Sequence, residues 1–177
     1  MNKLSNTKLD LKALADYEIF ENLQPDEVRY FADKFQYHES AADEVILKEG
    51  DHGDSLYLLL SGEVEVSQAL TMRVTTDDEP DSREKAITRL NEEMHPFFGE
   101  MSIFEEHETR SATIRAVKKC SFAEISREDF FAVIRDNPGF GIKVLENISR
   151  VLVSRLKKTN NDVIKLTTAL TLILEQR

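Results

Sequence analysis

The chain contains few of the residues that form disulfides, metal clusters or membrane spans. Of its 177 residues, none is tryptophan and one is cysteine, Cys120. A single cysteine excludes an internal disulfide and a cysteine-cluster metal site, so we expect a buried structural thiol. No apolar run approaches the roughly 18–20 residues that cross a bilayer, and the first residues do not lead into the apolar core of a signal peptide. We therefore expect a cytoplasmic protein with no membrane association.

Positive charge is also scarce. The chain has 23 lysines and arginines against 33 aspartates and glutamates, a net charge of −10. A nucleic-acid-binding domain normally carries a basic face, and no basic cluster here is longer than Arg155, Lys157 and Lys158. Direct DNA binding is therefore not expected. With 41% hydrophobic and 32% charged residues, the composition predicts one globular domain with an appendage.

The chain has only six glycines, and three of them, Gly50, Gly53 and Gly62, separate short apolar or alternating segments. This punctuation is typical of strands joined by turns. The predicted strands are residues 45–47, 54–60, 63–66, 86–90, 111–117 and 120–126. Residues 69–94, which contain the predicted returning strand 86–90, include a proline within an almost wholly acidic run at 77–81. This composition predicts a long hairpin loop, with an acidic docking motif as the alternative.

Helices are predicted on both sides of the strands, over residues 8–20, 25–35, 126–136 and 138–177. Pro25 suits a first helical position, and Ser126 with Asp129 has capping-box spacing. The last helix would be roughly 55 Å long at about 1.5 Å per residue, which is too long for one small β domain to cover. Its apolar residues recur at intervals of three and four, at Leu145, Ile148 and Leu152 and again at Val163, Leu166, Leu170 and Ile173. This stripe predicts pairing with a partner helix in a homodimer, the alternative being packing on its own domain only.

The residues with the clearest chemistry lie at 98–112. Gly99 allows a tight turn, and a helical turn that includes Met101 and Ser102 would present free N–H groups to an anion. Arg110 can hold two phosphate oxygens, Ser111 adds a hydroxyl or an N–H, and Glu100 can accept a bond from a ribose hydroxyl. Because Glu100 would repel a bare phosphate, the set favours a sugar phosphate. Each residue also has a structural alternative: Glu100 as a helix cap, Arg110 paired with Glu105, Glu106 or Glu108, and Ser111 as an ordinary strand residue.

This segment resembles the phosphate-binding cassette of cyclic-nucleotide-binding domains, in particular those of the catabolite activator family. Gly99 and Glu100, followed by Arg110, Ser111 and Ala112, match the family's Gly-Glu and Arg-Ser-Ala at the same separation. Residues 103–106, Ile-Phe-Glu-Glu, are similar to that family's Leu-Phe-Glu-Glu. The upstream residues Glu49-Gly50-Asp51, Gly53-Asp54, Leu56-Tyr57 and Gly62 are similar as well.

The resemblance implies a mainly β fold with flanking helices: an eight-stranded antiparallel β-roll (jelly roll) followed by a long C-terminal helix. Residues 1–137 would form the N-terminal helices and the β-roll, and 138–177 the helix for dimerisation and signalling. The implied ligand is cAMP or cGMP, with cAMP favoured, and no cofactor is expected. The ligand-binding residues would be Gly99, Glu100, Met101, Ser102, Arg110, Ser111 and Ala112, with Arg155, Thr159 and Asn160 from the last helix. Thr159 and Asn160 would meet the base edge, across a dimer.

The chain differs from that family at three places. Residues 94–97, Met-His-Pro-Phe, stand where the family has Gly-Asp or Gly-Ser, and the acidic segment at 69–94 is longer than usual. The 177 residues leave no room for the family's helix-turn-helix, so we expect a sensor module that acts on a protein effector the sequence does not identify.

Two other classes of function compete with the sensor. One is a nucleotide-independent dimeric scaffold with an empty pocket. The other is an enzyme of the metal-binding jelly-roll kind. Its histidines would have to cluster, but His38, His52, His95 and His107 are scattered without metal-ligand spacing, so we expect no metal site and no enzyme.

Overall fold

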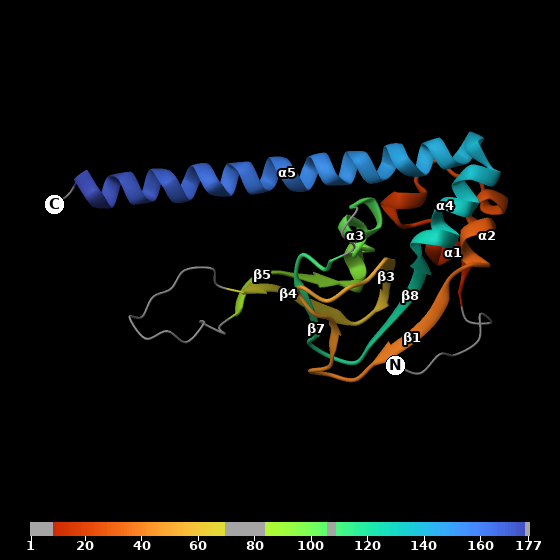
Figure 1. Cartoon of the computed structure of the whole chain (residues 1–177), viewed down its shortest axis with the longest axis horizontal. Coiled ribbons are helices and arrows are strands. Elements are labelled where there is room, and N and C mark those ends of the chain that lie inside the picture. Colours follow the sequence, from red (N-terminus) through yellow and green to blue (C-terminus); the bar gives the residue numbers. More distant parts are fainter. Residues whose placement is uncertain (1–8, 70–83, 106–108, 176–177) are drawn as a thin grey trace.

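Two four-stranded antiparallel sheets form the body of the protein, and a long helix runs along one side of it (Figure 1). The computed structural model describes residues 9–69, 84–105 and 109–175. The first sheet has the strand order β1-β8-β3-β6 and the second β2-β7-β4-β5. The strands are β1 Gln36–Ser40, β2 Val45–Leu47, β3 Ser55–Ser61, β4 Glu63–Ala69, β5 Glu84–Asn91, β6 Phe97–Phe98, β7 Thr113–Ala116 and β8 Cys120–Ser126. The predicted eight-stranded β-roll is confirmed.

Alternating side chains divide the core into two layers. Along β3, Tyr57 and Leu59 face the interior between the sheets, whereas Leu56 and Leu58 face the helices, as the period of two in a strand requires. Phe97 and Phe98 divide in the same way. Each layer is a separate apolar cluster, and the sheet that carries β3 is covered on both faces.

The helices lie against the outer face of this sheet (Figure 1). Those that pack there are α1 Leu11–Leu14, η1 Glu18–Phe20, α2 Pro25–Ala32, α3 Glu100–Phe104, α4 Arg127–Asp136 and the first half of α5 Pro138–Glu175. The 3-10 helix η2 Glu92–Met94 has no buried residue. The Ser126 hydroxyl caps α4 by accepting from the Asp129 N–H at 3.1 Å, as the sequence predicts. Burial of the phenylalanine rings from α2, η1 and α4 holds these elements together.

The single helix expected over residues 8–20 is wrong. The structure has one helical turn, α1, then a turn, then the 3-10 helix η1. Tyr17, between them, takes an extended conformation (φ −77°, ψ 131°). Its ring is buried and its hydroxyl donates to the Leu59 carbonyl. A continuous helix would need helical backbone angles at Tyr17, and the observed angles are extended.

The loop predicted within 69–94 is shorter than expected, because β4 continues to Ala69 and β5 begins at Glu84. These strands pair along their whole length, from Glu63 with Asn91 to Ala69 with Glu84. The acidic run at 77–81 lies outside the described residues.

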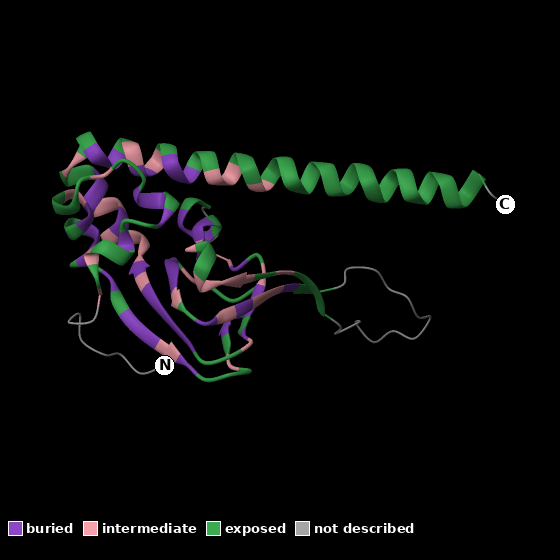
Figure 2. Cartoon of the chain, turned by 180° about the vertical axis from the view of Figure 1, so that it is seen from behind, coloured by how far each residue is buried: buried purple, intermediate pink, exposed green. Residues whose placement is uncertain are grey.

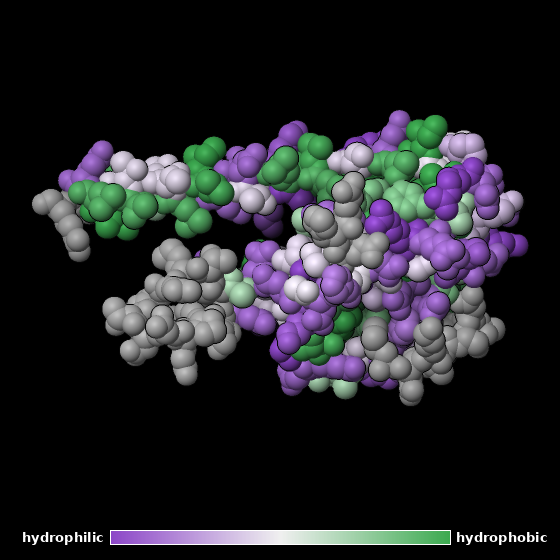
Figure 3. Space-filling model, viewed as in Figure 1, coloured by the Kyte–Doolittle hydropathy of each residue, from purple (hydrophilic) through white to green (hydrophobic). Residues whose placement is uncertain are grey.

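Helix α5 has two halves with different surroundings (Figure 2). Its first half packs on the domain: Val144 and Ile148 are buried, and Leu145 and Leu152 are partly buried against the same cluster. Beyond Arg155 the described helix is exposed, and apolar side chains appear along it (Figure 3). The stripe at 145–152 therefore serves the domain itself, which is the alternative the sequence left open. No helix in the described ranges is long and apolar enough to cross a bilayer.

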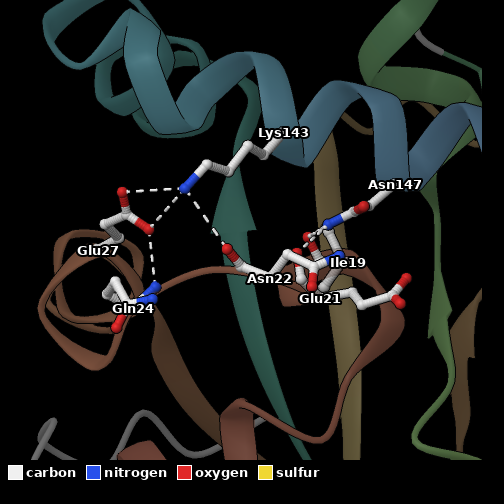
Figure 4. Close-up of polar contacts among 7 residues, drawn as sticks. All are labelled: Ile19, Glu21, Asn22, Gln24, Glu27, Lys143 and Asn147. Carbon is white, nitrogen blue, oxygen red and sulfur yellow. Dashed lines mark hydrogen bonds and ion pairs between the residues drawn. The ribbon is translucent and has the colours of Figure 1, made fainter.

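Polar contacts attach the base of α5 to the N-terminal segment (Figure 4). The Asn147 amide, 3% exposed, donates to the carbonyls of Ile19 (3.2 Å) and Glu21 (2.8 Å). One turn earlier, Lys143 Nζ is 3.3 Å from both carboxylate oxygens of Glu27. The Gln24 N–H and, to a lesser degree, Lys143 lower the pKa of Glu27 against the opposing effect of burial.

Candidate functional site: an arginine pocket beneath α5

Gly99 makes the turn between β6 and α3. Its φ is +78°, and a Cβ there would lie 2.7 Å from the Ser55 carbonyl oxygen. An L residue is therefore excluded both by conformation and by space. The turn places Glu100, Met101 and Ser102 at the start of α3, next to β3.

The strand that enters this turn is preceded by a second left-handed residue. His95 has φ +43° and caps η2. Histidine is one of the few non-glycine types enriched in this region, and the His95 ring also packs edge-on against Tyr17 at 5.3 Å. His95 thus makes the bend at the place where the sequence departs from the family pattern.

Arg110 is buried, only 6% exposed. Its Nη1 donates to the Ser55 carbonyl at 2.8 Å and to the Ser102 hydroxyl at 2.7 Å. The guanidinium also lies 5.5 Å from the ring centre of Tyr57. These partners are neutral, and no carboxylate of the described residues pairs with Arg110. Glu106 and Glu108, two of the partners that the sequence allows for Arg110, lie outside the described residues. Because an unpaired buried charge costs several kcal/mol, this site is suited to an anion that the described residues do not supply.

Glu100 is equally buried, 6% exposed, but it has a partner. Arg155 of α5 donates from Nη1 to Glu100 Oε1 at 2.7 Å and from Nη2 to the Phe97 carbonyl at 2.8 Å. Its guanidinium stands 4.8 Å from the centre of the Phe97 ring. Arg155 therefore links the long helix to the turn that carries Glu100.

These residues share one cavity of about 400 Å³. Its walls come from β2, β4, β5, β6, β7, residues 99–102 and 110–112, and α5. The lining residues are Leu47, Val66, Gln68, Ile87, Thr88, Leu90, Phe97, Phe98, Gly99, Glu100, Met101, Ser102, Arg110, Ser111, Ala112, Ile114, Arg155, Lys158, Thr159 and Asp162. Apolar side chains form much of the wall, with the charged groups gathered at the turn and on α5.

The pocket brings together all the predicted site residues except Asn160. Ser111 lies at the wall, where its hydroxyl is 3.3 Å from Met101 Sδ and its carbonyl accepts from Gln68 at 2.7 Å. Asn160 is exposed on α5 and is not part of the lining. An Asn160 contact with a ligand in this pocket would have to come from a partner chain.

Sequence reasoning missed the wall residues from the strands and, on α5, the charged residues Lys158 and Asp162. They stand three and seven positions after Arg155, and Thr159 stands four after it, so all four share one face of α5. This spacing was present in the sequence. His38, His52 and His95 are not among the residues that line the cavity, and His107 lies outside the described residues. Within the described part of the chain, no group of three or more His, Cys, Asp or Glu side chains is placed to hold a metal ion.

The fold and the pocket define a β-roll with a buried arginine at a cavity beneath a long helix, and comparison with known proteins identifies its family. Residues 37–137 match the model of the cyclic nucleotide-binding domain, which is more than half of the chain. The chain belongs to this family.

Among curated relatives, the cAMP-activated global transcriptional regulator CRP of Pasteurella multocida is 32% identical over 136 residues, covering 77% of this chain and 58% of its own. A CRP-like cAMP-activated global transcriptional regulator of Mycobacterium tuberculosis is 27% identical over 150 residues, 85% of this chain and 60% of its own. The chain thus spans under two thirds of these relatives.

Solved structures agree on the fold. The catabolite activator protein of Thermus thermophilus superimposes with a TM-score of 0.70 at 28% identity, covering 85% of this chain and 63% of that one. A cyclic nucleotide-binding domain from Methylobacillus flagellatus gives 0.71 at 27% identity, covering 87% and 80%.

Proposed function

We propose that this chain is a regulatory domain that binds a cyclic mononucleotide in the Arg110 pocket and passes the bound state through α5 to a protein effector. The observation that carries the proposal is Arg110: a buried guanidinium, held by neutral oxygens, at the wall of a cavity large enough for a small ligand. A cyclic phosphate supplies the missing negative charge. The cassette residues 99–102 and 110–112 would surround the phosphate and ribose.

Glu100 gives the site a means of reporting the ligand. In the free protein, Glu100 bonds to Arg155. A ribose hydroxyl that donates to Glu100 would either replace the bond from Arg155 or share the carboxylate with it. Either change would alter how strongly Glu100 holds Arg155, and with it α5, against the domain. The ligand shifts α5 only to the extent that it binds one helix arrangement better than the other.

We propose cAMP in preference to cGMP. The support is the similarity to regulators whose names describe them as cAMP-activated. Thr159 lines the pocket from α5 and would meet the base edge, and Lys158 and Asp162 lie on the same face. No reaction is assigned, because the pocket offers a binding arginine and no pairing of nucleophile and base.

The exposed half of α5 supports a homodimer. Its outward face carries a heptad pattern with Val153, Asn160, Thr167 and Leu174 at one core position and Leu156, Val163 and Leu170 at the other. The apolar members are 50–61% exposed in the single chain. Two parallel copies would bury this seam, and an asparagine at such a position favours a paired, in-register dimer. Arg155, Lys158, Thr159 and Asp162 would remain turned to each chain's own pocket.

The dimer is tested by sedimentation equilibrium. Leu156→Glu places a charge in the seam and is expected to give a monomer, whereas Lys165→Glu, on the opposite face, is expected to leave the dimer intact. A wild-type chain that sediments as a monomer at high micromolar concentration would refute the seam.

Ligand binding is tested by thermal melts with and without millimolar cAMP or cGMP. A ligand present at about 100 times its dissociation constant adds about 2.7 kcal/mol, which raises the Tm by about 5–10 °C for a chain of this size. Arg110→Ala should abolish the shift. Arg115→Ala is the matched control, because Arg115 is exposed and bonds to the Asp43 carbonyl away from the pocket. No shift in ligand-free wild-type protein would favour the nucleotide-independent scaffold.

A further inference from the structure

A row of side chains crosses the inner face of the first sheet and ends beside Arg110. His38 on β1, Glu124 on β8 and Tyr57 on β3 come from three strands that neighbour one another in the order β1-β8-β3. His38 Nε2 lies 2.6 Å from Glu124 Oε2, and the Tyr57 hydroxyl donates to Glu124 Oε1 at 2.9 Å. One carboxylate oxygen of Glu124 thus accepts a hydrogen bond from Tyr57, and the other lies close to the His38 imidazole, whose nitrogens make no hydrogen bond in the described structure.

The Tyr57 ring is fixed on its remaining sides. It stacks on Phe98 of β6, with ring centres 5.4 Å apart and planes 8° apart, and meets Phe122 edge-on at 5.8 Å. The side chain is 5% exposed. Burial, with the Glu124 charge adding to it, raises the pKa of Tyr57 well above its ordinary value, so the hydroxyl stays protonated and remains a donor.

Arg110 rests on this ring. Its guanidinium is 5.5 Å from the ring centre, within the range of a cation–π contact. The backbone of Gly53 lies against the same group, because a Cβ at Gly53 would be 2.4 Å from Arg110 Nε. The bonds to Ser55 and Ser102 both come from Nη1. Within the described residues Nε and Nη2 make no hydrogen bond, so the Tyr57 ring and the Gly53 backbone are the contacts that limit tilting of the guanidinium about the Nη1 bonds.

We propose that Tyr57 is a positioning residue, held in place by Glu124 and His38, that fixes the plane of the Arg110 guanidinium for the phosphate. The proposal rests on the proposed function of Arg110. A guanidinium recognises an anion through donors that lie in one plane, so an arginine whose plane tilts more widely distinguishes the two exocyclic oxygens of a cyclic phosphate less well. Because His38 of the edge strand β1 lies against Glu124, the contacts that position Tyr57 reach across the sheet to β1.

Tyr57→Phe tests the proposal, because it keeps the ring and removes the bond to Glu124. The matched control is Tyr37→Phe on β1, where another nearly buried tyrosine donates to a carboxylate, Glu39, at 3.1 Å. Both variants lose one hydroxyl–carboxylate bond, so a similar loss of thermal stability is expected from both. Only Tyr57→Phe is expected to weaken cAMP binding, by about two- to tenfold, the range that one net hydrogen bond supplies.

The specific measurement is calorimetric titration with the Rp and Sp phosphorothioate analogues of cAMP, which differ in the exocyclic oxygen that sulfur replaces. Wild type and Tyr37→Phe should bind the two isomers unequally, and Tyr57→Phe should bring the ratio of the two affinities toward one. If Tyr57→Phe lowers the affinity for both isomers by the same factor, the ratio is unchanged. This result would show that the row of side chains only packs the core and does not orient Arg110, and it would overturn the proposal.

A second measurement needs no ligand. The Arg110 guanidinium nitrogens are observed by NMR in the free protein and assigned by their absence in Arg110→Lys. Distinct, slowly exchanging Nη signals are expected in wild type and in Tyr37→Phe, and merged signals in Tyr57→Phe. Identical signals in all three would refute the positioning role. If wild type binds neither nucleotide, the proposed function fails, and these spectra still decide whether Tyr57 orients Arg110.

Discussion

Asn147 should contribute far more to stability than its neighbour Lys143, although both join α5 to the N-terminal segment. Asn147→Leu keeps the volume of the side chain and removes the donor to the Ile19 and Glu21 carbonyls. Each lost bond costs about 0.5–1.5 kcal/mol, and leaving a buried carbonyl unpaired adds to this. The sum is about 2–3 kcal/mol, which lowers the Tm by about 5–10 °C.

Lys143→Met is the comparison from the next turn of the same helix. Its ion pair with Glu27 is at the surface, with 40% of the lysine side chain exposed, and such pairs contribute about 0–1 kcal/mol. The assay is urea unfolding followed by circular dichroism, with thermal melts alongside. If Asn147→Leu destabilises the protein no more than Lys143→Met does, the buried amide is not what fastens the base of α5.

Three further results are expected. Gly99→Ala should lower the free energy of unfolding by about 1–3 kcal/mol and remove the nucleotide-dependent rise in Tm. Gly50→Ala, also at positive φ but with open space around it, should keep that rise. Equal behaviour of the two variants in the melts would contradict the account of Gly99. Because burial raises the pKa of the Cys120 thiol, Ellman's reagent at pH 8 should react with Cys120 only as the protein unfolds. If the thiol of the native protein reacts as fast as that of the protein unfolded in urea, Cys120 is not protected by burial. Arg155→Gln should speed hydrogen exchange of the backbone amides just beyond residue 155 in the ligand-free protein. Arg150→Gln, which removes the exposed Arg150–Glu21 ion pair, should not. Equal exchange rates in the two variants would show that Arg155 does not anchor α5.

The 98–112 segment could be predicted from the sequence because its chemistry is local. Gly99, Glu100 and Arg110 lie within one turn, one short helix and one loop, so their spacing alone indicates a shared site. The start of α4 at Ser126 was predictable for the same reason, since a helix cap depends on residues three apart. Strand β8 was predicted with the bounds that the structure has.

The rest depends on contacts between distant residues. The bond between Arg155 and Glu100 joins positions 55 residues apart, and no periodicity encodes it. Tyr17 interrupts the expected first helix because its hydroxyl meets the Leu59 carbonyl, 42 residues away. The apolar stripe on α5 was visible, but only packing decides that Ile148 faces the domain while Val163 does not.

Arg155 makes hydrogen bonds from α5 to the domain, and the described helix extends well past the body of the domain (Figure 1). About twenty residues follow this contact, which at about 1.5 Å per residue make a rigid arm of about 30 Å. A tilt of about 10° at Arg155 moves the end of such an arm by about 5 Å, nearly the pitch of one helical turn. If the proposed ligand adjusts this single ion pair, the arm would magnify the change into a displacement large enough to alter which residues meet at the far end.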